Sequence, residues 1–264
     1  LVARPRAAGA TVLAVELEVE SMTVATLGLG GHIFGRTRVE RSRGSTTPEE
    51  VVADLAQMSG PMLDSLPKGS NLVGMGIAVA GVVRRHDGFV HLAPNLGWEN
   101  VPLGDLVSTR LGLNVMMANE ADLGALAEHR RGAARGERSL IYVAGEVGVG
   151  IGIIYDGKPM LGAAGYAGEA GHTIVNPSGR RCRWGSAGCW ETEVGEEALA
   201  RLAGIPETDV TNGDLVDTVL RRAHGGDAGV FSALRQVGSW LGVGIGNLIN
   251  TFNPELVIIG GFFE

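Results

Sequence analysis

The chain has 264 residues, of which 45% are hydrophobic and 19% charged, so it can bury a sizeable core and is not globally disordered. Its formal net charge of −7 argues against a nucleic-acid-binding surface, which needs clustered lysine and arginine. The two cysteines, Cys182 and Cys189, are too few for a disulfide framework, so a cytoplasmic protein is the expectation.

The first half of the chain predicts an antiparallel meander followed by helix and strand. Three runs rich in alternating apolar residues predict the meander, at 11–19, 22–29 and 32–41. A helix is expected from Pro48 to about Ser59, because Thr47 can cap it and acidic residues follow in its first turn. A buried strand is expected at 71–79, and a loop at 80–98.

The second half repeats this plan loosely. Expected helices span 103–111, 120–131, 191–202, 211–222 and 230–250. Expected strands span 114–118, 139–144, 150–155, 169–175 and 256–259, with a loop rich in Gly, Arg and Cys at 176–189. This order predicts an α/β protein with two similar halves that divide near residue 120. No signal peptide and no run of the ~20 apolar residues that a membrane span needs is visible.

Four short stretches carry polar or metal-binding side chains at strand ends or in loops, where open α/β folds bind ligands. They are Pro94-Asn95-Leu96-Gly97-Trp98, Asn119-Glu120-Ala121-Asp122, Glu169-Ala170-Gly171-His172, and the segment from Cys182 to Glu191. Taken singly, each has an ordinary structural explanation, such as a turn residue or a first-turn helix charge. The combination in this order is far more specific.

Together these stretches resemble the ROK family (repressors, open reading frames and sugar kinases). Family members carry Glu-x-Gly-His, then nine residues, then Cys-x-Cys-Gly-x-x-Gly-Cys-x-Glu. Glu169, His172 and Cys182 stand at the matching positions, as do Gly185, Gly188, Cys189 and Glu191. The matching stretches extend from about Val12 to Gly261.

The resemblance implies a two-domain actin-like or hexokinase-like (ribonuclease H-like) ATPase fold with a sugar in the central cleft. The N-terminal lobe would span residues 1–120 and the C-terminal lobe residues 121–264, which would be incomplete at its C-terminus. Residues 1–10 would be a linker. The implied sugar-binding residues are Asn95, Asn119, Glu120, Glu169, His172 and Glu191. Carboxylates and amides suit a hexose because each sugar hydroxyl both donates and accepts hydrogen bonds.

The family loop is similar to a structural zinc site made of one His and three Cys. Here Trp184 occupies the second Cys position, which leaves His172, Cys182 and Cys189 as the metal ligands. Two alternatives remain open. Zinc is held by these three residues with a water or carboxylate as the fourth ligand, or the site is metal-free and the indole fills the space.

The kinase branch of the family holds ATP phosphates with an Asp-x-Gly-Gly-Thr turn and a Gly-Thr-Gly turn. The matching stretches here are Glu16-Leu17-Glu18-Val19-Glu20 and Gly145-Glu146-Val147-Gly148-Val149-Gly150. Acidic side chains replace the first turn's glycines and hydroxyl, and they would repel a triphosphate. Glu120 stands at the position of the kinase base, normally Asp, and Asp122 stands where Asn is usual. The expectation is therefore no ATP, no kinase activity and no catalytic residue.

The pattern resembles the repressor branch, in which this fold is the effector domain behind an N-terminal winged helix-turn-helix. The expected function is a sugar-sensing effector domain of a transcriptional regulator. The sugar would close the cleft and rotate subunits of a homodimer or homotetramer, and operator DNA would be bound only by a domain absent from this chain. The alternatives are an ATP-dependent, glucokinase-like ROK sugar kinase that uses Glu120, and an oligomerisation platform with an inactive pocket.

Overall fold

The structure is a computed structural model that describes residues 6–41, 46–206 and 215–263. By the density of its internal contacts, the chain divides into two compact units, Leu1–Glu120 and Ala121–Glu264. Of the expected linker, residues 1–5 lie outside the described residues, and Ala7–Gly9 form the short 3-10 turn η1 with Ala8 buried. No helix in the described ranges is both long and apolar enough to cross a bilayer.

The N-terminal unit is built on a five-stranded sheet in the order β3-β2-β1-β4-β8. Its strands are β1 Thr11–Leu17, β2 Ser21–Gly28, β3 Ile33–Glu40, β4 Leu72–Val79 and β8 Val115–Asn119. The predicted antiparallel meander of the first three strands is confirmed, and β4 and β8 continue the sheet in parallel. The 3-10 turn η2 Leu29–Gly31 joins β2 to β3.

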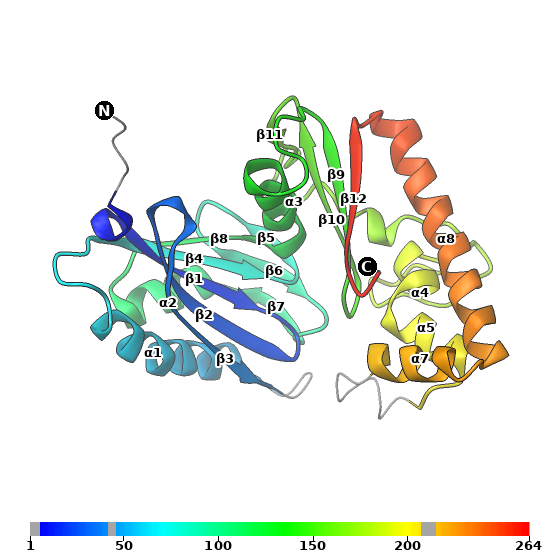
Figure 1. Ribbon diagram of the computed structural model, residues 1–264, viewed down its shortest axis with the longest axis horizontal. Coiled ribbons are helices and arrows are strands. Elements are labelled where there is room, and N and C mark those ends of the chain that lie inside the picture. The colour runs from blue at the N-terminus through cyan, green and yellow to red at the C-terminus, as the bar shows by residue number, and fades with distance from the viewer. Residues whose placement is uncertain (1–5, 42–45, 207–214, 264) are drawn as a thin grey trace. The chain divides into compact units, whose positions relative to one another are not determined.

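Two helices, α1 Pro48–Asp64 and α2 Leu103–Leu111, pack side by side on one face of this sheet (Figure 1). The predicted cap is confirmed: the Thr47 hydroxyl accepts from the Glu50 N–H at 3.2 Å, and the Glu50 carboxylate accepts from the Thr47 N–H at 2.8 Å. Helix α1 is longer than expected because it continues through Pro61 and buries Met62 in the core. Tertiary burial outweighs the local helix-breaking signal there.

The expectation of a loop at 80–98 is wrong. This segment holds β5 Val82–Arg84 and β6 Phe89–Ala93, which form a small antiparallel sheet with β7 Trp98–Val101. The strands are short, and the Gly and Pro residues between them hid the alternation in the sequence. The buried Trp98 fixes this sheet, because its indole N–H donates to the Thr46 carbonyl at 3.0 Å.

The C-terminal unit is built on a four-stranded sheet in the order β11-β10-β9-β12. Its strands are β9 Leu140–Gly145, β10 Val149–Tyr155, β11 Lys158–Pro159 and β12 Leu256–Gly261. Asp156 and Gly157 both have positive φ, as a two-residue hairpin turn requires. The strand order repeats the meander plus parallel strand of the N-terminal sheet, but β11 was not among the expected strands.

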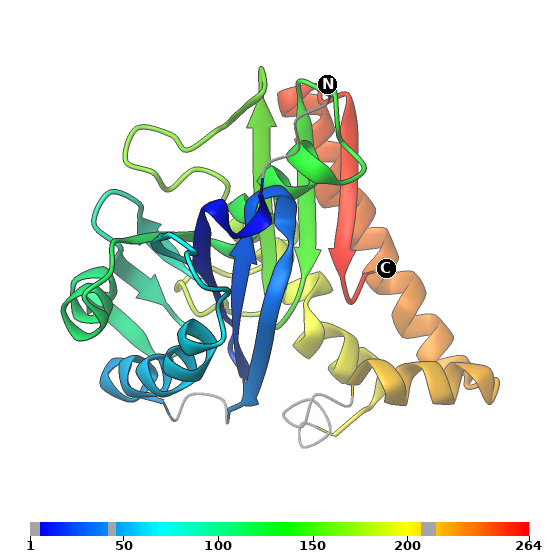
Figure 2. The same ribbon diagram turned by 60° about the vertical axis from the view of Figure 1, so that its left-hand side comes forward.

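Helices cover both faces of this second sheet. On one face, α3 Glu120–Arg131 packs closely because Gly150 and Gly152 of β10 leave room for Ala121. On the other face lie α4 Trp190–Val194, α5 Glu196–Ala203, α7 Leu215–His224 and α8 Ala228–Phe252. Figure 2 shows the long helix α8 beside the strands β9, β10 and β12. The first residues of the helix expected at 211–222 lie outside the described residues.

Two further expectations are corrected in this unit. The segment 169–175 is not a strand but contains the 3-10 turn η3 Ala170–His172, with a single bridge between Ile174 and Cys189. The helix expected at 191–202 is two helices, because Gly195 is extended between α4 and α5. A side chain at Gly195 would crowd the Glu191 carbonyl at 2.9 Å.

The packing of Trp190 against α8 yields a stability prediction. The Trp190 side chain is fully buried, and a β-carbon at Gly244 would overlap its indole ring. Gly244→Ala should therefore lower the free energy of unfolding by about 1–3 kcal/mol or more. Guanidinium denaturation followed by tryptophan fluorescence measures this change.

The matched control is Gly242→Ala in the same helix. No heavy atom lies within 4 Å of a β-carbon at this position. This variant should be neutral or raise the stability by about 0.5–1 kcal/mol, because alanine favours helix over glycine. Equal destabilisation by both variants would show that the Trp190 contact is not the cause.

Candidate functional site

The six residues expected to bind sugar are divided between the two units. Asn95, Asn119 and Glu120 belong to the N-terminal unit, and Glu169, His172 and Glu191 belong to the C-terminal unit. Asn95 lies in a tight turn after β6 that is closed by Gly97 at φ +71°. Asn119 ends β8, where its amide donates to the Gly81 carbonyl at 3.0 Å, and Glu120 begins α3.

Within the C-terminal unit, the fold brings Glu169, Glu191 and Asp122 into electrostatic contact. Glu169 precedes η3, Glu191 lies in the first turn of α4, and Asp122 is buried on α3. Burial, together with the negative charges of Asp122 and Glu191, raises the pKa of Glu169 to about 7. Glu169 can therefore donate as well as accept a hydrogen bond near neutral pH.

Glu191 is fixed by its surroundings. Its carboxylate accepts from the Val149 N–H at 3.3 Å, which links α4 to the start of β10. Burial raises the pKa of Glu191. The hydrogen bond from the Val149 N–H and the positive charge of the nearby Arg183 oppose this rise. The arrangement holds one carboxylate oxygen in place, as recognition of a polyhydroxyl ligand requires.

Asp122 was not among the residues selected as binding sugar. The usable sequence signal is that Asp122 stands on the same helical face as the small apolar residues Ala121 and Ala125, and the structure shows that all three are buried. An acidic residue on the buried face of a helix is uncommon and usually functional or paired. Glu193 was also missed. It is buried and accepts from the Asn176 amide at 3.0 Å, so it anchors the loop between η3 and α4.

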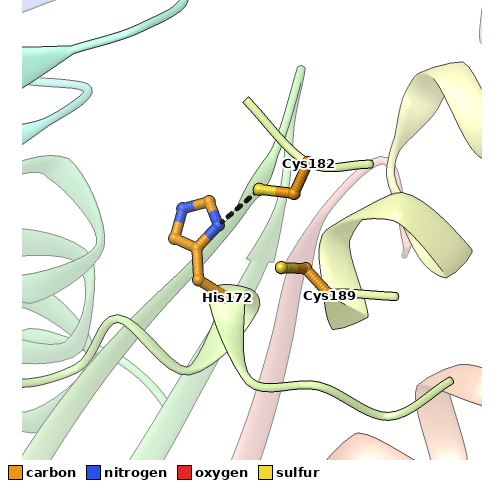
Figure 3. Close-up of side chains that lie close together, drawn as sticks. All are labelled: His172, Cys182 and Cys189. Atoms are coloured by element: carbon orange, nitrogen blue, oxygen red, sulfur yellow. Dashed lines mark hydrogen bonds between the residues drawn. The ribbon is translucent and has the colours of Figure 1, made fainter. Parts of the chain in front are cut away.

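The side chains of His172, Cys182 and Cys189 lie close together and form a second cluster in the C-terminal unit (Figure 3). Their ligand atoms all lie within 4.8 Å of one another. Cys182 Sγ is 3.3 Å from His172 Nδ1, and the other imidazole nitrogen points away from both sulfurs (Figure 3). The three residues therefore form a preassembled group of one nitrogen and two sulfur donors.

The protonation state of His172 suits metal binding, whereas that of Cys189 does not. Burial lowers the pKa of His172 to about 4, so the imidazole is neutral and has a free lone pair at neutral pH. Burial and the neighbouring Cys182 thiol raise the pKa of Cys189 to about 11, so a metal must displace its proton. Tetrahedral zinc would place such donor atoms about 3.6–3.8 Å apart, so the widest pair would have to close by about 1 Å.

Comparison with known proteins identifies the family of this chain. The model of the ROK family matches residues 12–263. The chain belongs to the ROK family. It is 33% identical to the xylose repressor of Caldicellulosiruptor bescii over 262 residues, which are 95% of this chain and 65% of that protein. This chain spans only 51–65% of the length of the curated xylose repressors that it matches.

Two solved ROK structures with different roles are equally similar. The glucokinase of Streptomyces griseus in complex with glucose and AMPPNP is 29% identical, with a TM-score of 0.79 over 95% of this chain and 83% of that chain. A ROK family transcriptional regulator, a homologue of the E. coli MLC protein, is 28% identical, with a TM-score of 0.79 over 96% of this chain and 66% of that chain. The actin-like, hexokinase-like fold expected from the sequence is thus confirmed, whereas similarity alone does not separate repressor from kinase.

The first turn that matches a ROK kinase phosphate loop joins β1 to β2. Its Glu18 carboxylate accepts from the Ser21 hydroxyl and pairs with Arg38 of β3 at 3.3 Å. Burial and the neighbouring Glu18 raise the pKa of Glu16, while Arg36 and Arg38 oppose the shift. Glu16 and Glu18, two of the acidic side chains expected to repel a triphosphate, are therefore partly neutralised by arginines of β3.

The second matching turn joins β9 to β10. The Glu146 N–H donates to the Gly148 carbonyl at 2.9 Å, and the Val149 N–H donates to Glu191. The Phe262 and Phe263 rings lie against Gly145, where a β-carbon would be within 3.0 Å of either ring. The N–H groups of Glu146 and Val149 are thus already engaged, and aromatic side chains crowd the first glycine of the turn.

The raised pKa of Glu169 yields a prediction for stability against pH. The folded state binds a proton at Glu169 up to about pH 7, whereas an unperturbed Glu has a pKa of 4.5. Between these two pH values the folded chain therefore binds more protons than the unfolded chain. The contribution of Glu169 to the free energy of unfolding falls as the pH rises from 4.5 to 7, by at most about 3 kcal/mol.

Glu169→Gln should remove this contribution, because the amide carries no titrating proton. Denaturation at a series of pH values, with EDTA present, should give a stability that declines less steeply between pH 4.5 and 7 than in the parent chain. Glu137→Gln, which changes an exposed carboxylate before β9, is the control and should leave the slope unchanged. Parallel profiles for the parent and Glu169→Gln would contradict the assignment.

Proposed function

We propose that this chain is the sugar-sensing effector domain of a ROK family transcriptional regulator. Glu169 and Glu191, with Asn95, Asn119, Glu120 and His172, are the proposed sugar-binding residues. This proposal is supported chiefly by a contrast between two parts of the C-terminal unit. Glu169 and Glu191 are half-buried carboxylates, whereas the turn that would hold phosphate has two of its backbone donors engaged and its first glycine covered.

The similarity to proteins named xylose repressors supports an aldose such as xylose as the effector. Buried groups that both donate and accept match adjacent sugar hydroxyls, and they disfavour ligands that leave them unpaired. The sugar would act by binding more tightly to one of two conformations of the regulator. Operator DNA would be contacted by a domain outside these 264 residues, because the net charge of −7 does not suit a phosphate-binding surface. The regulator would act as a homodimer or homotetramer.

A ROK sugar kinase is the second candidate. Relatives named glucokinase share 32–33% identity with this chain, and Glu120 stands at the position of the kinase base. Arginines near Glu16 and Glu18 weaken the electrostatic argument against ATP. The steric and hydrogen-bonding arguments stay, because the glycines and hydroxyl of the first phosphate turn are replaced by larger side chains.

His172, Cys182 and Cys189 would hold a zinc ion in this domain. Zinc at this position would order the loop between η3 and α4 rather than take part in a reaction. Hydrogen bonds within the chain already hold the two ends of this loop together. Cys189 forms a β-bridge with Ile174, and the backbone N–H of Trp190 donates to the Thr173 carbonyl at 2.9 Å.

Sugar binding tests the sensor proposal. Isothermal titration with a panel of xylose, glucose and an amino sugar should detect a ligand. Glu169→Ala should lower its affinity by about 10–100-fold, which corresponds to one or two charge-assisted hydrogen bonds. Glu137→Ala, which removes an exposed carboxylate of the same unit, is the matched control and should bind like the parent. Absence of binding by every sugar would leave the inactive-platform alternative.

Nucleotide chemistry separates the two candidates. We expect neither binding of an ATP analogue nor phosphorylation of any panel sugar by Mg-ATP. A ROK glucokinase assayed in parallel shows that the conditions permit turnover. Phosphorylation that disappears in Glu120→Gln would establish the kinase instead, because that residue would then be the base.

A further inference from the structure

A groove of about 350 Å³ lies between strand β3 and helix α1 of the N-terminal unit (Figure 1). It is lined by four apolar and three polar side chains, those of Thr37, Val39, Asp54, Gln57, Met58, Pro61 and Met62. Val39 is 41% exposed. Asp54, the charged residue of the lining, already pairs with Arg41 at 2.5 Å. The groove is therefore suited to apolar side chains.

The strand beside this groove has one free edge. In the described part of the chain, β3 pairs with β2 alone. The Arg41 N–H donates to the Glu20 carbonyl at 2.7 Å, and inward and outward residues alternate along an antiparallel ladder. The backbone N–H and C=O groups of Arg36, Arg38 and Glu40 therefore point to the free side. Such a row of groups is a template for one more strand.

The two faces of β3 differ in character. Val39 faces the groove, and the side chains of Arg36 and Arg38 lie on the opposite face because side chains alternate along a strand. Arg38 pairs with Glu18 at 3.3 Å and with Glu40 at 2.9 Å. Arg36 is exposed. An added strand would thus meet apolar surface on one face and an arginine on the other, where an acidic side chain is its favourable cross-strand neighbour.

We propose that the free edge of β3 and its groove bind an extended segment of a partner protein in which acidic and apolar residues alternate. The segment pairs with the outward backbone groups of β3 as an additional strand of the N-terminal sheet. Its apolar side chains enter the groove against Met58 and Pro61, and an acidic side chain on the other face lies beside Arg36. Backbone hydrogen bonds supply the affinity, and the two faces select the sequence.

Peptide binding to the 264-residue chain tests this proposal. The probe is fluorescein-labelled Val-Glu-Val-Glu-Val with an amidated end, and its anisotropy is followed as the chain is added. We expect saturable binding. The same peptide with lysine in place of glutamate keeps the apolar face and reverses the charge, so it should bind at least about 10-fold more weakly.

A proline on the free edge separates strand addition from simple charge attraction. Arg38→Pro removes an outward N–H without removing a hydrogen bond to β2, and it should weaken peptide binding by about 10-fold or more. Arg38→Ala is the matched control, because it loses the same charge and keeps the N–H. This variant should bind within about 3-fold of the parent.

A second pair of variants tests the groove. Val39→Glu places a charge in the apolar groove and should also weaken binding by about 10-fold. Met116→Glu is its control, because Met116 is 75% exposed on β8 at the opposite edge of the same sheet. This variant should bind the peptide like the parent.

Four results would overturn the proposal. They are no saturable binding by the parent, equal binding of the two peptides, equal affinities of Arg38→Pro and Arg38→Ala, and equal affinities of Val39→Glu and Met116→Glu. A dimer of the parent in sedimentation that Arg38→Pro dissociates would assign the edge to a second copy instead. None of these measurements involves a sugar, so the proposal and the sensor function fail separately.

Discussion

Burial of the Trp190 side chain is the constraint that positions Cys189 and Glu191, one residue of each candidate site. Its indole is fully enclosed, donates to the Trp240 carbonyl at 2.9 Å, and occupies the space left by Gly244 of α8. This contact fixes the start of α4. Cys189 and Glu191 flank Trp190 on the chain, so the same anchor positions one ligand of the His/Cys/Cys cluster and one carboxylate of the proposed sugar site.

Three carboxyl groups of the C-terminal unit lie close together in a partly buried region, and this proximity determines their protonation. Asp122, Glu169 and Glu191 cannot all be ionised there without cost, and the result is a Glu169 that is part-protonated at neutral pH. Such a group presents both a donor and an acceptor, which is what a sugar hydroxyl needs.

The family and the fold could be predicted from the sequence, because spaced motifs and strand patterns are local. The Glu-x-Gly-His and Cys-rich stretches lie within 23 residues of one another, and the meander of β1 to β3 follows from alternation along each strand. Other features depend on distant residues and could not be predicted. The continuation of α1 through Pro61 depends on burial of Met62 in the core, and Gly195, between α4 and α5, lies against the Val147 carbonyl of the β9–β10 turn.

The sequence by itself determined which donor and acceptor groups the chain carries: the side chains proposed to bind sugar, the group of one histidine and two cysteines, the substituted phosphate turns, and Trp184 in place of a cysteine. Only the tertiary structure decided what those groups can do. It paired Glu18 with Arg38, placed Asp122 beside Glu169, and stacked Trp184 on His172. The physical reason is that pKa values, ion pairs and coordination depend on distance and solvent exposure in three dimensions, and residues far apart in the chain set both.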